Sequence, residues 1–372
     1  MRFVRRVVVG LAMCVCVAKV AGAGTYKFVD LHPGNPPYDE TYAAGISNGQ
    51  AVGYGHWTGS PDLPPGPAYR ALLWTAPQPS SYVDLSQPDS KGPFYAYGAG
   101  DGQQVGTLGG GFDARALLWT GSADSMIDLT PTAFKGAAAR HAAAGQQVGI
   151  GYLPDDTAHA LLWRGSADNF VDLHPAGFVR SFAQGTDGTH QVGHGSIDPQ
   201  SVNSGHALLW SGSADTAVDL HPSGFIMSYA YRVSGNQQVG WGFLPADPNA
   251  LERALLWTGS ADSAIDLTPP DALYARAMDT NGIHQVGAVK NHAALWTGSA
   301  DSMVDLHAFL PAGYQASLAV AIDANGIIVG NAWATGSRTK SHVVMWIPVP
   351  EPGSLGVIAI SSLALLRRRV KR

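Results

Sequence analysis

Aspartate recurs at two fixed places in this sequence. The first series stands before leucine in seven similar segments: Asp30, Asp84, Asp128, Asp172, Asp219, Asp266 and Asp305. The second stands in Gly-Ser-Ala-Asp tetrapeptides: Asp124, Asp168, Asp215, Asp262 and Asp301. Carboxylates at such regular spacing could form paired acid and base groups, or ring a channel and bind a cation.

A structural role explains both aspartate series better. A residue that stands at one position in every repeat does the same local job in each repeat. An Asp beside a turn can accept backbone N–H bonds there, and Asp is ordinary in a hairpin turn. A calcium loop is the alternative at the tetrapeptides, although their spacing matches no EF-hand-type loop. We otherwise expect no cofactor.

The 13 histidines raise the question of a metal site. His32, His174 and His221 each precede proline in Asp-Leu-His-Pro segments. The sequence contains neither a His-Glu-x-x-His motif nor a close His/Asp triad, so these histidines are interpreted as structural. We expect no metal site and assign no catalytic residue.

Two further series share the period of the aspartates. Tryptophan follows Leu or Met at Trp74, Trp119, Trp163, Trp210, Trp257, Trp296 and Trp346, and a Val-Gly pair ends at Gly53, Gly106, Gly149, Gly193, Gly240, Gly287 and Gly330. The period is about 45 residues, a length typical of propeller blades. Each series has seven members, which predicts seven structural units.

One unit contains four candidate strands. Between Phe94 and Pro131 these are FYAYGAG, QQVGTLG, ARALLW and MIDL, separated by turn-forming residues. The third strand carries apolar residues on both faces, so it must lie between two layers. Repeated four-stranded sheets that are covered on both faces predict a β-propeller.

The two ends of the repeat array favour a closed ring over an open solenoid. The array begins with an isolated fourth strand, Tyr26 to Pro33, and ends with an isolated third strand, His342 to Val349. In a ring these two strands complete one blade and remove its incomplete edge. We therefore predict an all-β, seven-bladed propeller in which the N-terminal strand closes the last blade.

The chain divides into three parts. Residues 1–23 have a basic start, a short apolar run and a small-residue site, which predict a secretory signal peptide. Residues 24–348 hold the seven repeats. Residues 349–372 combine a Pro-Glu-Pro motif, a short apolar helix and a basic tail. Both cysteines, Cys14 and Cys16, lie in the first part, so the exported chain is expected to have no disulfide.

The C-terminal part resembles the PEP-CTERM sorting signal of Gram-negative bacteria. The matching residues are Pro350, Glu351, Pro352, Arg367, Arg368 and Arg369. The resemblance implies processing by an exosortase-type transpeptidase, with transient or single-helix attachment to the inner membrane beforehand. It implies a final location in the cell envelope or outside the cell.

The repeat itself resembles the HAF family of extracellular repeats. His159-Ala160, His206-Ala207 and His292-Ala293 keep the opening of that family's pattern, which continues to a Leu-Trp pair, an Asp-Leu pair and a Val-Gly strand. The family is defined by its repeats, so the resemblance implies an extracellular setting and no particular reaction.

The charge of the repeat body limits its partners. The two ends hold nine of the 23 Lys and Arg residues, which leaves 14 bases against 28 acids. Such a body repels nucleic acid and anionic membranes, and we expect it to bind neither.

Binding residues are expected where the repeats differ from one another. The residue after each Val-Gly pair varies, and aromatic residues outside the repeat pattern gather in the same strands. The candidates are Trp57, Tyr152, His194, Trp241, Phe243 and Trp333. Their rings could stack on sugars, or they could pack between blades.

Two functions are compatible with these features. The first is a non-enzymatic, exported protein of the cell surface or matrix that binds exopolysaccharide or another surface protein. The second is a secreted polysaccharide hydrolase or lyase with a site at the mouth of the propeller. The regular blades and the missing catalytic motif favour the first.

Overall fold

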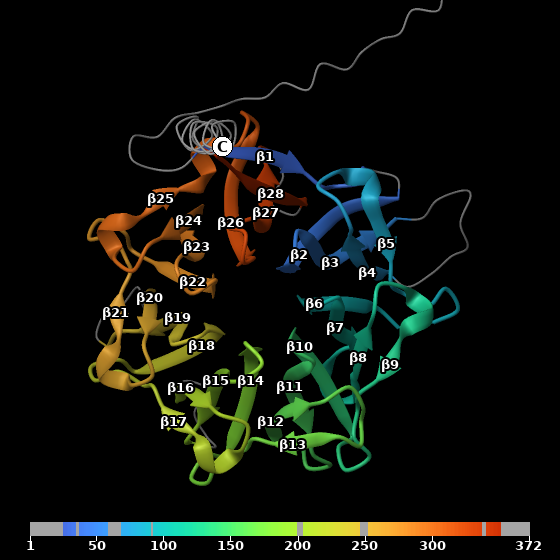
Figure 1. The fold of residues 1–372 in the computed structure, drawn as a ribbon, viewed down its shortest axis with the longest axis vertical. Helices are drawn as coiled ribbons and strands as arrows, with labels where there is room; N and C mark the ends of the chain where they lie inside the picture. Colours follow the sequence, from blue (N-terminus) through green and yellow to red (C-terminus); the bar gives the residue numbers. More distant parts are fainter. Residues whose placement is uncertain are drawn as a thin grey trace, which may run out of the picture.

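The computed structural model describes residues 25–34, 37–58, 68–90, 92–198, 204–245, 252–336 and 340–350. They form seven four-stranded antiparallel sheets arranged as blades around a central axis (Figure 1). The predicted seven-bladed propeller is therefore confirmed. The predicted signal peptide and all of the sorting segment beyond Pro350 lie outside the described residues.

The first strand of each blade lies nearest the axis and the last lies at the rim (Figure 1). The strands of blades 1 to 4 are β2 (Tyr38–Ser47), β3 (Gln50–Trp57), β4 (Tyr69–Trp74), β5 (Tyr82–Asp84); β6 (Phe94–Gly100), β7 (Gln103–Leu108), β8 (Arg115–Trp119), β9 (Ile127–Asp128); β10 (Gly136–Ala143), β11 (Gln146–Tyr152), β12 (Ala158–Trp163), β13 (Phe170–Asp172); and β14 (Arg180–Thr186), β15 (Gln191–Ser196), β16 (Gly205–Trp210), β17 (Val218–Asp219).

The strands of blades 5 to 7 are β18 (Met227–Ser234), β19 (Gln237–Phe243), β20 (Glu252–Trp257), β21 (Ile265–Asp266); β22 (Ala275–Thr280), β23 (Gln285–Val289), β24 (His292–Trp296), β25 (Val304–Asp305); and β26 (Tyr314–Ile322), β27 (Ile328–Ala334), β28 (Ser341–Val349), β1 (Thr25–Asp30). Short 3-10 helices lie in the connections: η1 (Pro79–Ser81), η2 (Gly111–Asp113), η3 (Ala123–Ser125), η4 (Ala214–Thr216), η5 (Ala261–Ser263), η6 (Ala300–Ser302) and η7 (Leu306–Phe309).

The N-terminal strand closes the ring as predicted. β1 pairs antiparallel with β28, so that Phe28 lies opposite Trp346, and blade 7 has the strand order β1-β28-β27-β26. Side chains of blade 7 also bind blade 1: Asn331 Oδ1 accepts from Ala43 N at 2.8 Å, and Asp323 Oδ2 accepts from Gly49 N at 2.8 Å. The last junction of the ring is thus held by backbone and side chains together.

The repeat tryptophans fill the spaces between blades. All seven are fully buried, and each packs against residues of the preceding blade, as Trp163 does on Leu118 and Leu129 of blade 2. The third strand is therefore covered on both faces, as its sequence predicts. Burying a side chain of this size stabilises the fold by roughly 1.5–3 kcal/mol or more. The seven tryptophans at the blade interfaces therefore make a large contribution to the free energy of unfolding.

The glycine of each Val-Gly pair allows a bulge in the inner strand. Each inner strand has a register shift opposite this glycine, as between Ala139 and His141 in β10. A Cβ on Gly149 would stand 1.9 Å from Ala138 O, so no larger residue fits. The bulge sets one residue of every inner strand apart at the same height along the axis; these residues are Ala44, Tyr97, Arg140, Gln184, Tyr231, Met278 and Val320.

The aspartates before leucine have the structural role that we predicted. In blade 3, Asp172 Oδ1 accepts from His174 N at 2.9 Å and its Oδ2 bonds His159 Nδ1 at 2.7 Å. The His174 ring reaches Ser181 Oγ on the next blade at 2.9 Å, and Ser181 Oγ accepts from Ala160 N at 2.9 Å. Blades 4, 6 and 7 repeat this arrangement around Asp219, Asp305 and Asp30.

In the other three blades, different residues bind the aspartate and accept a hydrogen bond from the buried backbone N–H of the third strand. In blade 2, Arg115 replaces the first histidine as partner of Asp128, and Thr130 replaces the second. Thr130 Oγ1 itself accepts from Ala116 N at 3.0 Å, and the next blade then carries apolar Ala137 where blade 4 has Ser181. Blades 1 and 5 follow this second form around Asp84 and Asp266. Both forms satisfy one buried backbone N–H.

The two forms predict a rescue between mutations. Ser181→Ala leaves Ala160 N without an acceptor, which should lower the free energy of unfolding by about 1–3 kcal/mol. His174→Thr combined with Ser181→Ala recreates the blade 2 form and should recover most of that loss, as measured by urea unfolding. A double variant no more stable than Ser181→Ala would show that the two forms are not equivalent.

The partly buried histidines predict a loss of stability in acid. Burial and the neighbouring His342 lower the pKa of His32 to about 4, and burial with a stacked histidine lowers the pKa of His174, His221 and His307. Below the histidine pKa of about 6.5 in the unfolded chain, these histidines are protonated when the chain is unfolded but remain neutral when it is folded. The free energy of unfolding should therefore be constant above pH 7 and fall between pH 6.5 and 5. A profile that is flat down to pH 5 would contradict this, and the His174→Thr, Ser181→Ala variant should fall less steeply.

Candidate functional site

Three of the predicted binding residues lie together on blades 4 and 5. The His194 ring lies 4.7 Å from both Phe182 and Tyr229, and Tyr229 lies 4.4 Å from Trp241. Trp241 also contacts Phe243, at 5.2 Å. These distances join ring centroids. His194 and Trp241 follow the Val-Gly pair, and their side chains pack against the next blade.

Trp57 and Tyr152 lie elsewhere. Trp57 is only 8% exposed, packs on Tyr38 and has Arg70 over its ring at 4.0 Å, so both sides of the ring are covered by protein. Tyr152 is half-buried and contacts exposed Phe112 at 5.1 Å on the connection of blade 2. Neither residue joins the group of blades 4 and 5.

Trp333 lines a cleft between blades 6 and 7. The cleft has a volume of about 690 Å³. Its wall is mainly apolar and is formed by Leu273, Met278, Ala288, Ala316, Leu318 and Trp333, with polar side chains from Glu252, Tyr274, Arg276, Lys290, Asn291 and Ser317. A cleft of this size with an aromatic wall and a few polar groups is typical of a ligand site.

The cleft exists because blade 6 is shortened at this place. Only Lys290 and Asn291 connect β23 to β24, whereas the corresponding connection in every other blade has five residues or more. Lys290 adopts a left-handed conformation (φ 55°) to make this tight turn. In addition, Ala288 stands at the position that Trp241 fills in blade 5. The short connection between β23 and β24 and the small side chain of Ala288 together leave the space of the cleft open.

Polar groups at the rim of the cleft hold one another in place. Arg276 forms a two-point ion pair with Glu252 and lies over the Trp241 ring at 4.8 Å, and this carboxylate raises the pKa of Arg276. Tyr274 Oη donates to Asn291 Oδ1 at 2.6 Å. Arg276 therefore links the cleft to the aromatic group of blades 4 and 5.

A second aromatic group lies on blades 1 and 2. Tyr54 stands at its centre, with its ring 5.0–6.3 Å from those of Tyr42, Tyr69, Tyr95 and Tyr97. All five rings are partly exposed, and burial raises the pKa of Tyr54 to about 12. Leu318 of the cleft pairs with Asn331, and Asn331 Oδ1 accepts from Ala43 N, the residue after Tyr42.

Serine, histidine and aspartate also meet in the blades without forming a hydrolase triad. Ser317 lies 2.8 Å from His307, but it is only 2% exposed and accepts from Ala293 N. The stretch Gly45-Ile46-Ser47-Asn48-Gly49 has the spacing of a nucleophile elbow, yet it forms the hairpin between β2 and β3 rather than a strand-to-helix turn. Neither serine is placed as a nucleophile.

Within the described ranges, no three His, Cys, Asp or Glu side chains gather closely enough to hold a metal ion. In that part of the chain no helix is long and apolar enough to cross a membrane. Of the predicted sorting residues only Pro350 is described, and it is exposed.

Sequence reasoning missed most of the cleft, although a signal was present. Arg276 and Met278 stand on the inner strand β22 and Tyr274 directly precedes it, and these side chains were not singled out from the sequence. The interval from Gly287 to Trp296 is the shortest between a Val-Gly pair and its tryptophan in the chain. A shortened repeat predicts a gap in one face of a ring, and that gap is the cleft.

Comparison with known proteins identifies the fold alone. No known protein family matches the sequence, and no curated protein matches it either. Among solved structures, a puromycin hydrolase mutant is similar with a TM-score of 0.55 at 12% identity, over 85% of this chain and 53% of its own. A Mycobacterium tuberculosis puromycin-hydrolyzing peptidase (TM-score 0.51, 10% identity, 87% and 53%) and a Pyrococcus horikoshii acylaminoacyl peptidase (0.50, 9%, 89% and 56%) are also similar. The chain spans about half the length of these proteins.

Proposed function

We propose that this protein is an exported, non-enzymatic binding protein of the cell surface or extracellular matrix, and that its ligand is a polysaccharide. The observation that carries the proposal is the cleft of about 690 Å³ beside Trp333. An aromatic face offers the flat apolar surface on which a sugar ring stacks, and the rim supplies hydrogen-bonding groups for its hydroxyls. Arg276 and Asn291 provide donors and acceptors at that rim.

Export is supported by the two ends of the chain and by the repeat. The N-terminal segment has the features of a signal peptide, the repeat resembles HAF repeats, and residues 349–372 resemble a PEP-CTERM signal. An exosortase-type transpeptidase is the partner proposed for that signal. Exopolysaccharide in the envelope or matrix would then be the ligand within reach.

Substitution of Trp333 tests the binding site. Affinity electrophoresis in gels that contain neutral or acidic polysaccharides should find at least one that retards the protein. Trp333→Ala should weaken that binding about tenfold, equivalent to about 1.4 kcal/mol, because the stacking face is lost. The matched control is Phe112→Ala, which removes an exposed aromatic ring from blade 2, outside the cleft.

A second variant fills the cleft instead of trimming it. Ala288→Trp places in blade 6 the side chain that blade 5 carries at Trp241, and should block the same binding while thermal unfolding shows a folded ring. Retardation by no polysaccharide, or equal retardation of all variants, would contradict the proposal. Release of reducing sugars at catalytic rates would favour the hydrolase or lyase alternative.

A further inference from the structure

Two smaller hollows adjoin the cleft between blades 6 and 7. The middle hollow, of about 490 Å³, is lined by Asn291, Gln315, Ala316 and Trp333. The outer hollow, of about 370 Å³, reaches Asp305 on the outer strand of blade 6. Asn291 lines the cleft and both hollows, and the middle hollow shares Ala316 and Trp333 with the cleft and Gln315 with the outer hollow. The three spaces therefore form one groove, which we call the blade 6 groove.

The blade 6 groove crosses all four strands of its blade. Met278 at the inner end belongs to β22, Ala288 to β23, Ala293 to β24, and Asp305 at the outer end to β25. Three strand spacings of about 4.8 Å make the groove about 14 Å long. A single sugar ring is shorter than this, whereas several consecutive units of a linear chain fill such a length.

The connection of Lys290 and Asn291 lies at the middle of the groove and is fixed on both sides. Lys290 N donates to Tyr274 O at 3.0 Å, and Ser317 N of blade 7 donates to Asn291 O at 2.8 Å. An extended peptide would bind chiefly to unpaired backbone groups, and these groups are already paired. The side-chain amides of Asn291 and Gln315 are exposed instead, and each amide combines donors with an acceptor, which suits sugar hydroxyls.

Basic and acidic side chains are paired within the groove. The pairs are Arg276 with Glu252, Lys290 with Asp271, and His292 with Asp305. These six are all the charged or ionisable basic and acidic side chains among the described residues that line the groove. A carboxylate ligand would have to break one of the pairs to gain a cationic partner, which is costly. A neutral hydroxyl can bind beside a pair and leave it intact.

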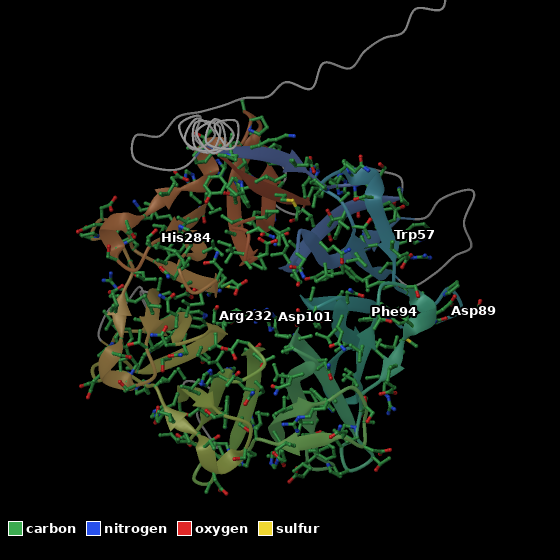
Figure 2. All side chains as sticks on the ribbon, in the orientation of Figure 1. Trp57, Asp89, Phe94, Asp101, Arg232 and His284 are labelled. Carbon is green, nitrogen blue, oxygen red and sulfur yellow. The ribbon has the colours of Figure 1, made fainter. Side chains whose placement is uncertain are left out.

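Charges outside the groove also disfavour an acidic ligand. The repeat body holds 14 bases against 28 acids, so it repels a polyanion. Arg232 and Asp101 lie near the axis of the ring (Figure 2), and neither of them lines the groove. The charge of Arg232 is therefore not available to a ligand in the groove. A neutral polymer meets no such repulsion.

We propose that the blade 6 groove binds a neutral, linear polysaccharide along its length, across several consecutive sugar units. The inference rests on the proposed function and names the class of its ligand. Trp333 offers a stacking face where the cleft meets the middle hollow, and the amides of Asn291 and Gln315 bind hydroxyls of the units that follow. The fixed connection between them keeps the groove in shape before the ligand arrives, which lowers the entropy cost of binding.

The dependence of affinity on chain length and charge tests the inference. Cello-, laminari-, malto-, manno- and xylo-oligosaccharides, from disaccharide to hexasaccharide, are titrated against the full-length protein by isothermal calorimetry at fixed ionic strength. In at least one of these neutral series the affinity should rise about tenfold or more from the disaccharide to the hexasaccharide. Oligogalacturonates of the same lengths should bind about tenfold more weakly than that series, because the groove holds no unpaired cation for them.

A variant at the outer part of the groove separates its ends. Gln315→Ala should weaken binding of the hexasaccharide about fivefold and leave the disaccharide unchanged, because Gln315 lines the two hollows and not the cleft. Trp333→Ala should weaken both. The matched control, Gln78→Ala, removes an exposed amide from blade 1 and should change neither. Should Gln315→Ala fail to fold, Gln315→Glu keeps the shape, removes the donor and should show the same difference.

The outcomes separate this inference from the proposed function. Equal affinity for disaccharide and hexasaccharide in every series, or an equal loss of both in the Gln315 variant, overturns the extended groove. Oligogalacturonates that bind as tightly as the neutral series overturn the neutral assignment. In either case a polysaccharide whose binding Trp333→Ala weakens leaves the proposed function standing. Binding of no oligosaccharide and no polysaccharide overturns both.

Discussion

The pairing of β1 with β28 is the contact on which the whole structure depends. A four-stranded blade cannot cover both faces of its own third strand, so each blade needs a neighbour on either side. Six of the seven junctions form between blades that follow one another along the chain. The seventh needs β1 and β28, and the bond between Asp30 and His342 joins residues 312 positions apart.

No disulfide joins β1 to β28, because neither strand contains a cysteine. Trp74 donates its Nε1–H to Leu31 O, and its ring packs on Val343 and Met345 of blade 7, so closure buries the tryptophan of blade 1. The entropy cost of closing so long a chain grows only slowly with length. Backbone pairing and the burial of one large interface are sufficient to offset it.

The ring divides its residues between scaffold and binding surface. Positions that meet the same neighbour in every blade carry the same chemistry: the buried tryptophan, the glycine opposite the bulge, and the aspartate with its two forms of partner. The two forms show that the requirement is physical, because each ends in a hydroxyl that accepts one buried N–H. The bulged residues of the inner strands differ from blade to blade, with Tyr97, Arg140 and Met278 at equivalent places.

Composition and periodicity were sufficient to predict the architecture. Strand number, blade number and ring closure depend on which residues must be buried, and burial is written into the alternation of side chains and the length of the repeat. The role of the aspartates also followed from the sequence, since a residue repeated in every unit meets the same local geometry.

The binding surface depended on the tertiary structure. His194, Trp241 and Phe243 were found from their variability and do lie together, but Trp57 shares their sequence features and is buried under Arg70. Arg140 lies over Tyr97 of another blade, and Arg276 and Met278 line the cleft together with residues of other blades. No pattern along the chain predicts these contacts. The sequence alone thus determined a closed ring of seven blades, because local burial repeats along the chain. Only the folded ring decided which side chains face the cleft and channel, because residues from different blades meet there.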